Sequence, residues 1–135
     1  MRTILPLLIL VLLLSLNIHA EDIIQPEDKD WQAFIDDAHD TYSQKRRGDE
    51  AMRILALRVD EVLTETKKNL DKLATDLLNR NQQAWEKQIR TKCSFMADTY
   101  RGGSAADIAF RYCIVNEQKL RISELRSMHQ YRMLP

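Results

Sequence analysis

The chain contains two cysteines, and they stand almost symmetrically about a pair of adjacent glycines. Cys93 lies nine residues before Gly102, and Cys113 lies ten residues after Gly103. If two antiparallel helices meet at the glycines, each cysteine lies about 14 Å from the turn, at about 1.5 Å per residue. This spacing predicts a helical hairpin in which Cys93 and Cys113 face each other and form a disulfide. The alternative is that both are free, buried thiols.

The first twenty residues have the pattern of an export signal. Arg2 supplies a positive charge, residues 4–16 are apolar, and Ala20 is a small residue before an acidic segment. We therefore predict a signal peptide over residues 1–20 and a single domain over residues 21–135. The alternative is a retained membrane anchor, but the apolar run is shorter than the roughly 18–20 residues that a spanning helix needs.

Export has consequences for the cysteines and for the place where the protein works. In an oxidising compartment, two cysteines of a small domain usually pair. No cysteine lies near the predicted cleavage site after Ala20, so a lipid-modified N-terminus is not expected. We predict a periplasmic protein of a Gram-negative envelope that is not a lipoprotein and does not contact the membrane after signal cleavage.

The formal net charge of the chain is zero, but the charges are unevenly distributed. Residues 21–50 carry ten acidic and four basic side chains, whereas residues 51–135 carry ten acidic and fifteen basic ones. The basic side chains of the second segment are dispersed among acidic ones, so no nucleic-acid partner is expected. The two segments could attract each other or face different partners, and the alternative is ordinary solvated helix surfaces.

Apolar residues at helical spacing predict a first helix at about Lys29–Arg47. Three basic residues followed by Gly48 are typical of a helix end. The apolar stripe of this predicted helix comprises Trp31, Phe34, Ile35, Ala38 and Tyr42.

The next segment, residues 49–101, contains neither glycine nor proline and carries one apolar stripe at steps of three and four residues. A continuous helix of this length would reach about 75 Å at about 1.5 Å per residue, which is too long for a compact domain of this size. We therefore expect either an elongated molecule or a break. The poor helix formers Asn79 and Asn81 favour a bend near residues 75–81.

Gly102 and Gly103 give the backbone freedom for a tight turn, after which a last helix is predicted at about Ser104–Tyr131. Ser104 with Asp107 three residues later is similar to a capping box. The predicted inward face of this helix comprises Ile108, Tyr112, Val115, Ile122 and Leu125. The predicted class is all-α: a disulfide-closed helical hairpin with one preceding helix and a long central helix.

No constellation in the sequence indicates catalysis. The densest acidic cluster comprises Asp36, Asp37, His39 and Asp40. Adjacent helical residues point in different directions, and no cysteine or second histidine joins the cluster, so a solvated helix face is favoured over a metal site. The spacings of a nucleophile elbow, a phosphate loop and a zinc site do not occur. We predict a protein that is not an enzyme and that uses no metal or cofactor.

The register of the predicted hairpin also places a tryptophan. Trp85 lies 17 residues before the turn and Leu120 lies 17 residues after it, so Trp85 is expected beside Leu120 and Arg121. A buried indole with the Arg121 guanidinium over its ring would have a structural role. The alternative is an exposed aromatic anchor for a partner.

The C-terminal half contains a characteristic series of residues: Gln82, Trp85, Cys93, Tyr100, Gly102, Gly103, Ser104, Cys113, Arg121 and Leu125. In these residues and their spacing, the chain resembles the bacterial LprI-type lysozyme-inhibitor-like family of small exported helical proteins. The resemblance covers residues 82–125 and implies the helical fold, the disulfide and, more loosely, inhibition of lysozyme. Positions that depart from the family pattern are Thr64, Lys67, Ile89 and Gln118.

Our first hypothesis is a protein-binding module that inhibits a lysozyme or another peptidoglycan hydrolase. The expected binding residues form the hairpin tip: Tyr100, Arg101, Gly102, Gly103 and Ser104. A disulfide would hold the tip rigid, so that it loses less entropy on entering a cleft. Tyr100 would be the anchor and Arg101 would meet cleft carboxylates, whereas the remaining signature residues, Gln82, Trp85, Arg121 and Leu125, would be structural. The alternative for the tip is a plain turn between helices.

A second hypothesis comes from another class of protein. A periplasmic structural or assembly module could self-associate into a homodimer through the apolar stripe of its long helix, without inhibitor activity. The exposed length of the helix within residues 49–98 is the feature that would discriminate between the two.

Overall fold

The computed structural model describes residues 24–132, and every regular element in that range is helical. In chain order these elements are the 3-10 turn η1 (Pro26–Asp28), α2 (Trp31–Asp36), α3 (Thr41–Lys67), α4 (Lys72–Ala97), the 3-10 turn η2 (Asp98–Tyr100) and α5 (Ser104–Arg132). The predicted all-α class is therefore confirmed. The predicted signal peptide lies outside the described residues. None of the helices described is long and apolar enough to cross a membrane.

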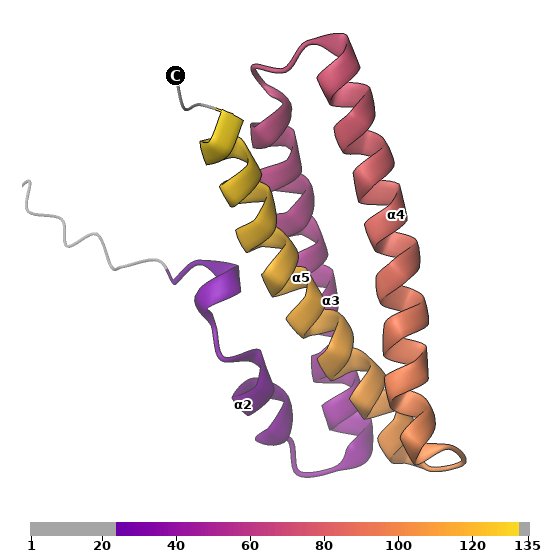
Figure 1. Ribbon diagram of the computed structural model, residues 1–135. Coiled ribbons are helices and arrows are strands. Elements are labelled where there is room, and N and C mark those ends of the chain that lie inside the picture. The colour runs from indigo at the N-terminus through magenta and orange to yellow at the C-terminus, as the bar shows by residue number, and fades with distance from the viewer. Residues whose placement is uncertain (1–23, 133–135) are drawn as a thin grey trace, which may run out of the picture.

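Helix α5 is central to the arrangement, because it packs along both α3 and α4 (Figure 1). Helices α3 and α4 run antiparallel and are joined by a short turn, but they make few direct contacts with each other. The short α2 packs against α3 on the side away from α4 (Figure 1). The fold therefore depends on α5 to hold α4 beside the rest of the molecule.

Three aspartates determine where helices begin: Asp30 before α2, Asp40 before α3 and Asp71 before α4. Each carboxylate accepts a hydrogen bond from the backbone N–H three residues later, at 2.8 to 2.9 Å. Because Asp40 starts a new helix, the predicted single helix at Lys29–Arg47 is wrong. The structure has two helices in this region, separated by residues 37–40.

Gly48 lies within α3, where it is buried, and does not end a helix. A Cβ atom at this position would lie 2.6 Å from Cδ of Arg111 in α5. Glycine therefore permits a close approach of α3 and α5, and this packing outweighs its low helix propensity. The sequence pattern was misleading because basic residues before a glycine are also typical of helix ends.

The segment without glycine or proline breaks at residues 68–71, so the predicted bend near residues 75–81 is wrong. The Asp71 cap starts α4 at this point. Asn81 lies inside α4, where its side-chain oxygen Oδ1 accepts a hydrogen bond of 2.6 Å from Arg121. This tertiary contact offsets the weak helix propensity of asparagine.

The buried apolar residues form two clusters. The larger one joins α2, α3 and α5 and comprises Trp31, Ile35, Ala51, Leu55, Val59, Val62, Leu63, Val115, Ile122 and Leu125. The smaller one joins α4 to α5 and comprises Ile89, Cys93, Cys113 and Ile114. Helix α4 thus has a small share of the apolar core, and its attachment depends on the disulfide and on polar contacts.

Candidate functional site

The tip of the α4–α5 hairpin is a tight turn in which Gly102 adopts a φ of 83°. The N–H of Arg101 donates to the carbonyl oxygen of Asp98 at 3.0 Å, and the N–H of Gly103 donates to that of Tyr100 at 3.1 Å. A positive φ strains residues with a Cβ atom, so glycine is required at position 102. The tip is an ordered structure with its own backbone hydrogen bonds.

A disulfide between Cys93 and Cys113 closes the hairpin below the tip, as predicted. The two Cα atoms are 5.4 Å apart, within the usual range for a disulfide. Cys93 is completely buried, and Sγ of Cys113 lies 3.7 Å from Sδ of Met96. Neither cysteine is a free thiol.

The tip residues expected to bind a partner are on the surface. Tyr100 is 52% exposed, and the Arg101 side chain is also exposed. Arg101 donates two hydrogen bonds to the Asp98 carboxylate, at 2.8 and 2.6 Å. The charge of Arg101 is therefore partly compensated within the protein, so the tip is closer to neutral than the sequence suggests.

An exposed apolar surface adjoins the tip, and the sequence interpretation missed it. We define the tip patch as Phe95, Met96 and Tyr100, whose exposed fractions are 81%, 51% and 52%. These residues line a shallow cavity of about 450 Å³ that extends to α5. The signal that could have revealed the patch is Phe95, which stands two residues after Cys93 and therefore outside the buried stripe of α4.

Three of the remaining signature residues, Gln82, Trp85 and Arg121, meet between α4 and α5. Arg121 is 1% exposed and donates hydrogen bonds to Gln82 at 3.0 Å and to Asn81 at 2.6 Å. It also pairs with Glu124 at 2.7 Å, and its guanidinium carbon lies 5.4 Å from the centre of the Trp85 ring. The expected stacking of Arg121 on Trp85 is present. We call Gln82, Trp85 and Arg121 the arginine clamp.

The arginine clamp and the tip are separate features. Trp85 precedes Tyr100 by 15 residues, which corresponds to about 20 Å along the helix. Leu120, which was expected beside Trp85, is instead 63% exposed. Leu125, the last signature residue, is fully buried in the larger cluster. The structure therefore places the tip residues together at the end of the hairpin and the other signature residues in its packed interior.

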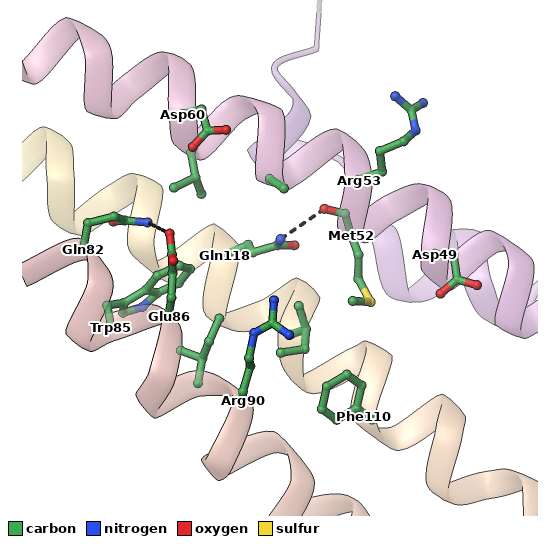
Figure 2. Close-up of a pocket in the computed structure, with 14 residues that line it drawn as sticks. Asp49, Met52, Arg53, Asp60, Gln82, Trp85, Glu86, Arg90, Phe110 and Gln118 are labelled. Carbon is green, nitrogen blue, oxygen red and sulfur yellow. Dashed lines mark hydrogen bonds between the residues drawn. The ribbon is translucent and has the colours of Figure 1, made fainter. Parts of the chain in front are cut away.

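A further cavity of about 420 Å³ lies between α3 and α4, over the surface of α5 (Figure 2). We call it the central cavity. Its apolar side chains include Met52, Val59, Trp85, Ile89, Phe110 and Ile114. Its charged side chains are Asp49, Arg53, Asp60, Glu86 and Arg90. The sequence could not indicate this cavity, because its lining comes from three helices.

Gln118 of α5 also lines the central cavity and is only 7% exposed. Its Nε2 donates to the carbonyl oxygen of Met52 at 3.1 Å, as Figure 2 shows. Its Oε1 is buried and has no hydrogen-bond partner among the described residues. Buried polar atoms in folded proteins are almost always paired, so this acceptor is unusual.

The acidic cluster of the N-terminal region has structural partners. The hydroxyl group of Tyr112 donates to Asp36, and Arg47 pairs with Asp37 at 3.4 Å. Burial, together with the hydrogen bond to Asp36 and its charge, raises the pKa of the Tyr112 phenol, so it stays a donor. Within residues 24–132, no group of three or more histidine, cysteine or acidic side chains is arranged to hold a metal ion.

A family model described as "Lysozyme inhibitor LprI" matches residues 44–125. This range contains most of α3, the whole of the disulfide-closed hairpin tip and the arginine clamp. No curated protein and no solved structure matches the chain. The matched range covers more than half of the chain, and on this evidence the chain belongs to the LprI lysozyme-inhibitor family.

Proposed function

We propose that this protein is an exported, periplasmic protein-binding module that inhibits a lysozyme or a related peptidoglycan hydrolase by inserting its hairpin tip into the enzyme's cleft. The observation that carries the proposal is the tip patch, an exposed apolar surface at the end of a hairpin closed by a disulfide. Membership of the LprI family supports an inhibitor of this class.

The rigidity of the hairpin favours this use of the tip. The Cys93–Cys113 bond and the backbone hydrogen bonds of the turn order the tip before any partner is bound. An ordered segment loses less conformational entropy on binding than a mobile one. Exposed aromatic residues on such a segment are typical anchors of protein interfaces, and Phe95 and Tyr100 supply two of them.

The pairing of Arg101 with Asp98 modifies the proposed electrostatics. An enzyme cleft that contains carboxylates would have to compete with Asp98 for the guanidinium of Arg101. The main contribution of the tip is then apolar contact by the tip patch, and Arg101 contributes orientation. The acidic segment of residues 21–40 would help the protein to approach a cationic enzyme.

The proposal is tested by measuring lysis of cell-wall suspensions by several types of lysozyme in the presence of the protein. We expect the oxidised protein to slow lysis by at least one type and the reduced protein to be weaker, because reduction loosens the tip. If no type is slowed at micromolar concentrations of oxidised protein, the inhibitor function is wrong.

A second candidate function is self-association, and one observation favours it. Leu73 and Leu77 of α4 are exposed, and Leu77 lines an apolar cavity of about 660 Å³ formed with α3 and α5. A second copy could cover this surface. Light scattering of the protein over a range of concentrations distinguishes the two functions, because a mass equal to the monomer at every concentration excludes assembly.

A further inference from the structure

The lining of the central cavity includes polar groups that have no hydrogen-bond or ion-pair partner among the described residues. None of these groups belongs to the hairpin tip. The clearest is Oε1 of Gln118, a residue of the cavity lining, because this oxygen is buried and has no donor among the described residues. Nε2 of the same side chain donates to the backbone carbonyl oxygen of Met52. Rotation of the amide group to bring Oε1 to another donor would break this hydrogen bond. A ligand with an N–H group in the cavity would satisfy this acceptor.

Arg90 is a second group without a partner. Glu86 lies one helical turn before Arg90, a spacing that usually favours an ion pair. In this structure Glu86 instead accepts a hydrogen bond from Nε2 of Gln82 at 3.1 Å, and Arg90 has no hydrogen bond or ion pair within residues 24–132. Figure 2 shows the Arg90 side chain extending from α4 into the space between the helices. A guanidinium in this position is suited to bind a carboxylate through two parallel hydrogen bonds.

Asp60 supplies the opposite charge at the other end of the cavity. It lies on α3 toward Gln82 and Trp85, whereas Arg90 lies toward Phe110 (Figure 2). Asp60 likewise has no hydrogen bond or ion pair with any residue that the structure describes. The cavity therefore has an unpaired acidic end, an unpaired basic end and a buried acceptor between them, over an apolar surface.

The separation of the two ends sets the size of a ligand. Met52 packs in the same cluster as Ile89, so Arg90 lies opposite the turn of α3 that contains Met52. Asp60 is eight residues farther along α3, an offset of about 12 Å along the helix axis. An extended peptide covers about 3.3–3.6 Å per residue, so three residues span about 10 Å, which is close to this offset. The cavity volume of about 420 Å³ is within the range of small-ligand sites, roughly 300–1,000 Å³.

We infer that the central cavity is a binding site for a short peptide of about three residues with free termini. Its amino group pairs with Asp60, its carboxylate with Arg90, and a backbone N–H donates to Oε1 of Gln118. An apolar central side chain of the peptide packs against Trp85 and Ile89. This site is independent of the hairpin tip and of the function proposed for it.

The test uses the full-length oxidised protein and the tripeptide Ala-Leu-Ala in three forms: with free termini, N-acetylated, and with a C-terminal amide. Binding is followed by NMR through the indole N–H of Trp85 and the side-chain amide of Gln118. We expect saturable shifts of both signals with the free peptide. Each blocked terminus should weaken binding by about tenfold or more, the effect of losing one charge-assisted hydrogen bond.

Two variants connect the termini to their partners. Arg90→Gln should weaken binding of the free peptide and leave binding of the C-terminal amide unchanged. Asp60→Asn should weaken binding of the free peptide and leave binding of the N-acetylated peptide unchanged. Both side chains are exposed, so the fold should persist. The matched control is Arg80→Gln, which changes an exposed arginine of α4 outside the cavity. The inference is overturned by the absence of saturable shifts at millimolar peptide, by equal affinity for the three forms, or by unchanged affinity in Arg90→Gln.

Discussion

At the scale of single residues, the most constrained side chain is Arg121. It brings a full positive charge into the α4–α5 contact, where it is satisfied by two amide oxygens, one carboxylate and the face of an indole. A lysine could not reproduce this contact, because a guanidinium presents several donors in one plane and an ammonium does not. The arginine clamp therefore gives Gln82, Trp85 and Arg121 one shared structural role in this chain.

The substitution Arg121→Met keeps most of the side-chain volume and removes the donors. The oxygens of Gln82 and Asn81 then lose hydrogen bonds to a charged group, so we expect the free energy of unfolding to fall by about 2–4 kcal/mol. Urea unfolding followed by circular dichroism measures this change. Arg80→Met is the control and should change stability by less than about 0.5 kcal/mol, as surface substitutions usually do. An equal effect of both substitutions would show that the clamp does not stabilise the fold.

Glu27 is a second residue whose contacts affect stability, in this case in a pH-dependent way. Its side chain is buried, which raises its pKa, but hydrogen bonds from Arg58 and the charges of Arg126 and Arg58 outweigh this effect and lower the pKa below 4.5. A carboxylate whose pKa is lower in the folded state stabilises the protein above its unfolded pKa, and this contribution is lost as the pH falls through the folded value.

We therefore expect the wild-type protein to lose stability progressively below about pH 4.5. Glu27→Gln should be less stable than the wild type by about 1–2 kcal/mol at neutral pH, and this difference should shrink in acid. Thermal unfolding at a series of pH values measures both. The control is Glu50→Gln, at an exposed carboxylate. A constant difference between Glu27→Gln and wild type from pH 7 to pH 3 would contradict the assignment.

At the scale of the elements, the hairpin was the most predictable part of the fold. Cys93 lies nine residues before Gly102 and Cys113 lies ten residues after Gly103, so this near-symmetry predicted the hairpin and its disulfide. The helix boundaries upstream were less predictable. Asp40 and Asp71 cap helices, yet nothing distinguishes them in sequence from the other acidic residues, because a cap is defined by the backbone conformation around it.

The surfaces proposed to bind partners were harder to predict than the helices, for a geometric reason. The tip residues are continuous in sequence, so the tip itself could be proposed from the turn. The central cavity joins Asp60, Arg90 and Gln118 from three helices, and only the packing of those helices brings them together. Gly48 was misinterpreted for the same reason, because its role is a contact with Arg111 in a distant helix.

The close approach of α3 and α5 at Gly48 leads to a specific prediction. In Gly48→Ala the new methyl group would lie 2.6 Å from Cδ of Arg111, so α5 or the arginine must shift. We expect a loss of about 1–3 kcal/mol from overpacking, despite the better helix propensity of alanine. Gly103→Ala is the control, since its methyl group would meet an ordinary contact of 3.5 Å. A stabilised Gly48→Ala protein in urea unfolding would contradict this account of the packing.

The attachment of α4 to the rest of the molecule leads to another prediction. The disulfide closes a loop of 20 residues, for which the chain-entropy estimate is about 3 kcal/mol. The paired substitution Cys93→Ser with Cys113→Ser should lower stability by about this amount. Amide hydrogen exchange should show that α4 loses protection first, because it has the smaller share of the apolar core. Loss of protection in α3 before α4 would contradict the proposed role of the disulfide.

At the scale of the whole molecule, α5 is the structural axis and the two ends of the α4–α5 hairpin have different tasks. The end away from the tip is held by the arginine clamp. The outer end is closed by the disulfide and presents the tip patch. Its apolar side chains are exposed to solvent, which is typical of an interaction surface. This division, a rigid hairpin with an apolar tip, is the central claim.

The most direct test of this claim is the inhibition constant in the lysis assay for the wild-type protein and for variants of the tip patch. The combined substitution Phe95→Ser with Tyr100→Ala should weaken inhibition by tenfold or more, the effect of losing about 1.4 kcal/mol or more of binding free energy. The control is Tyr131→Ala, which removes a tyrosine that is 78% exposed in the last turn of α5, at the opposite end of that helix from the tip. The account predicts that Tyr131→Ala inhibits as strongly as the wild type. Equal inhibition by the wild-type protein and the tip-patch variant would contradict it.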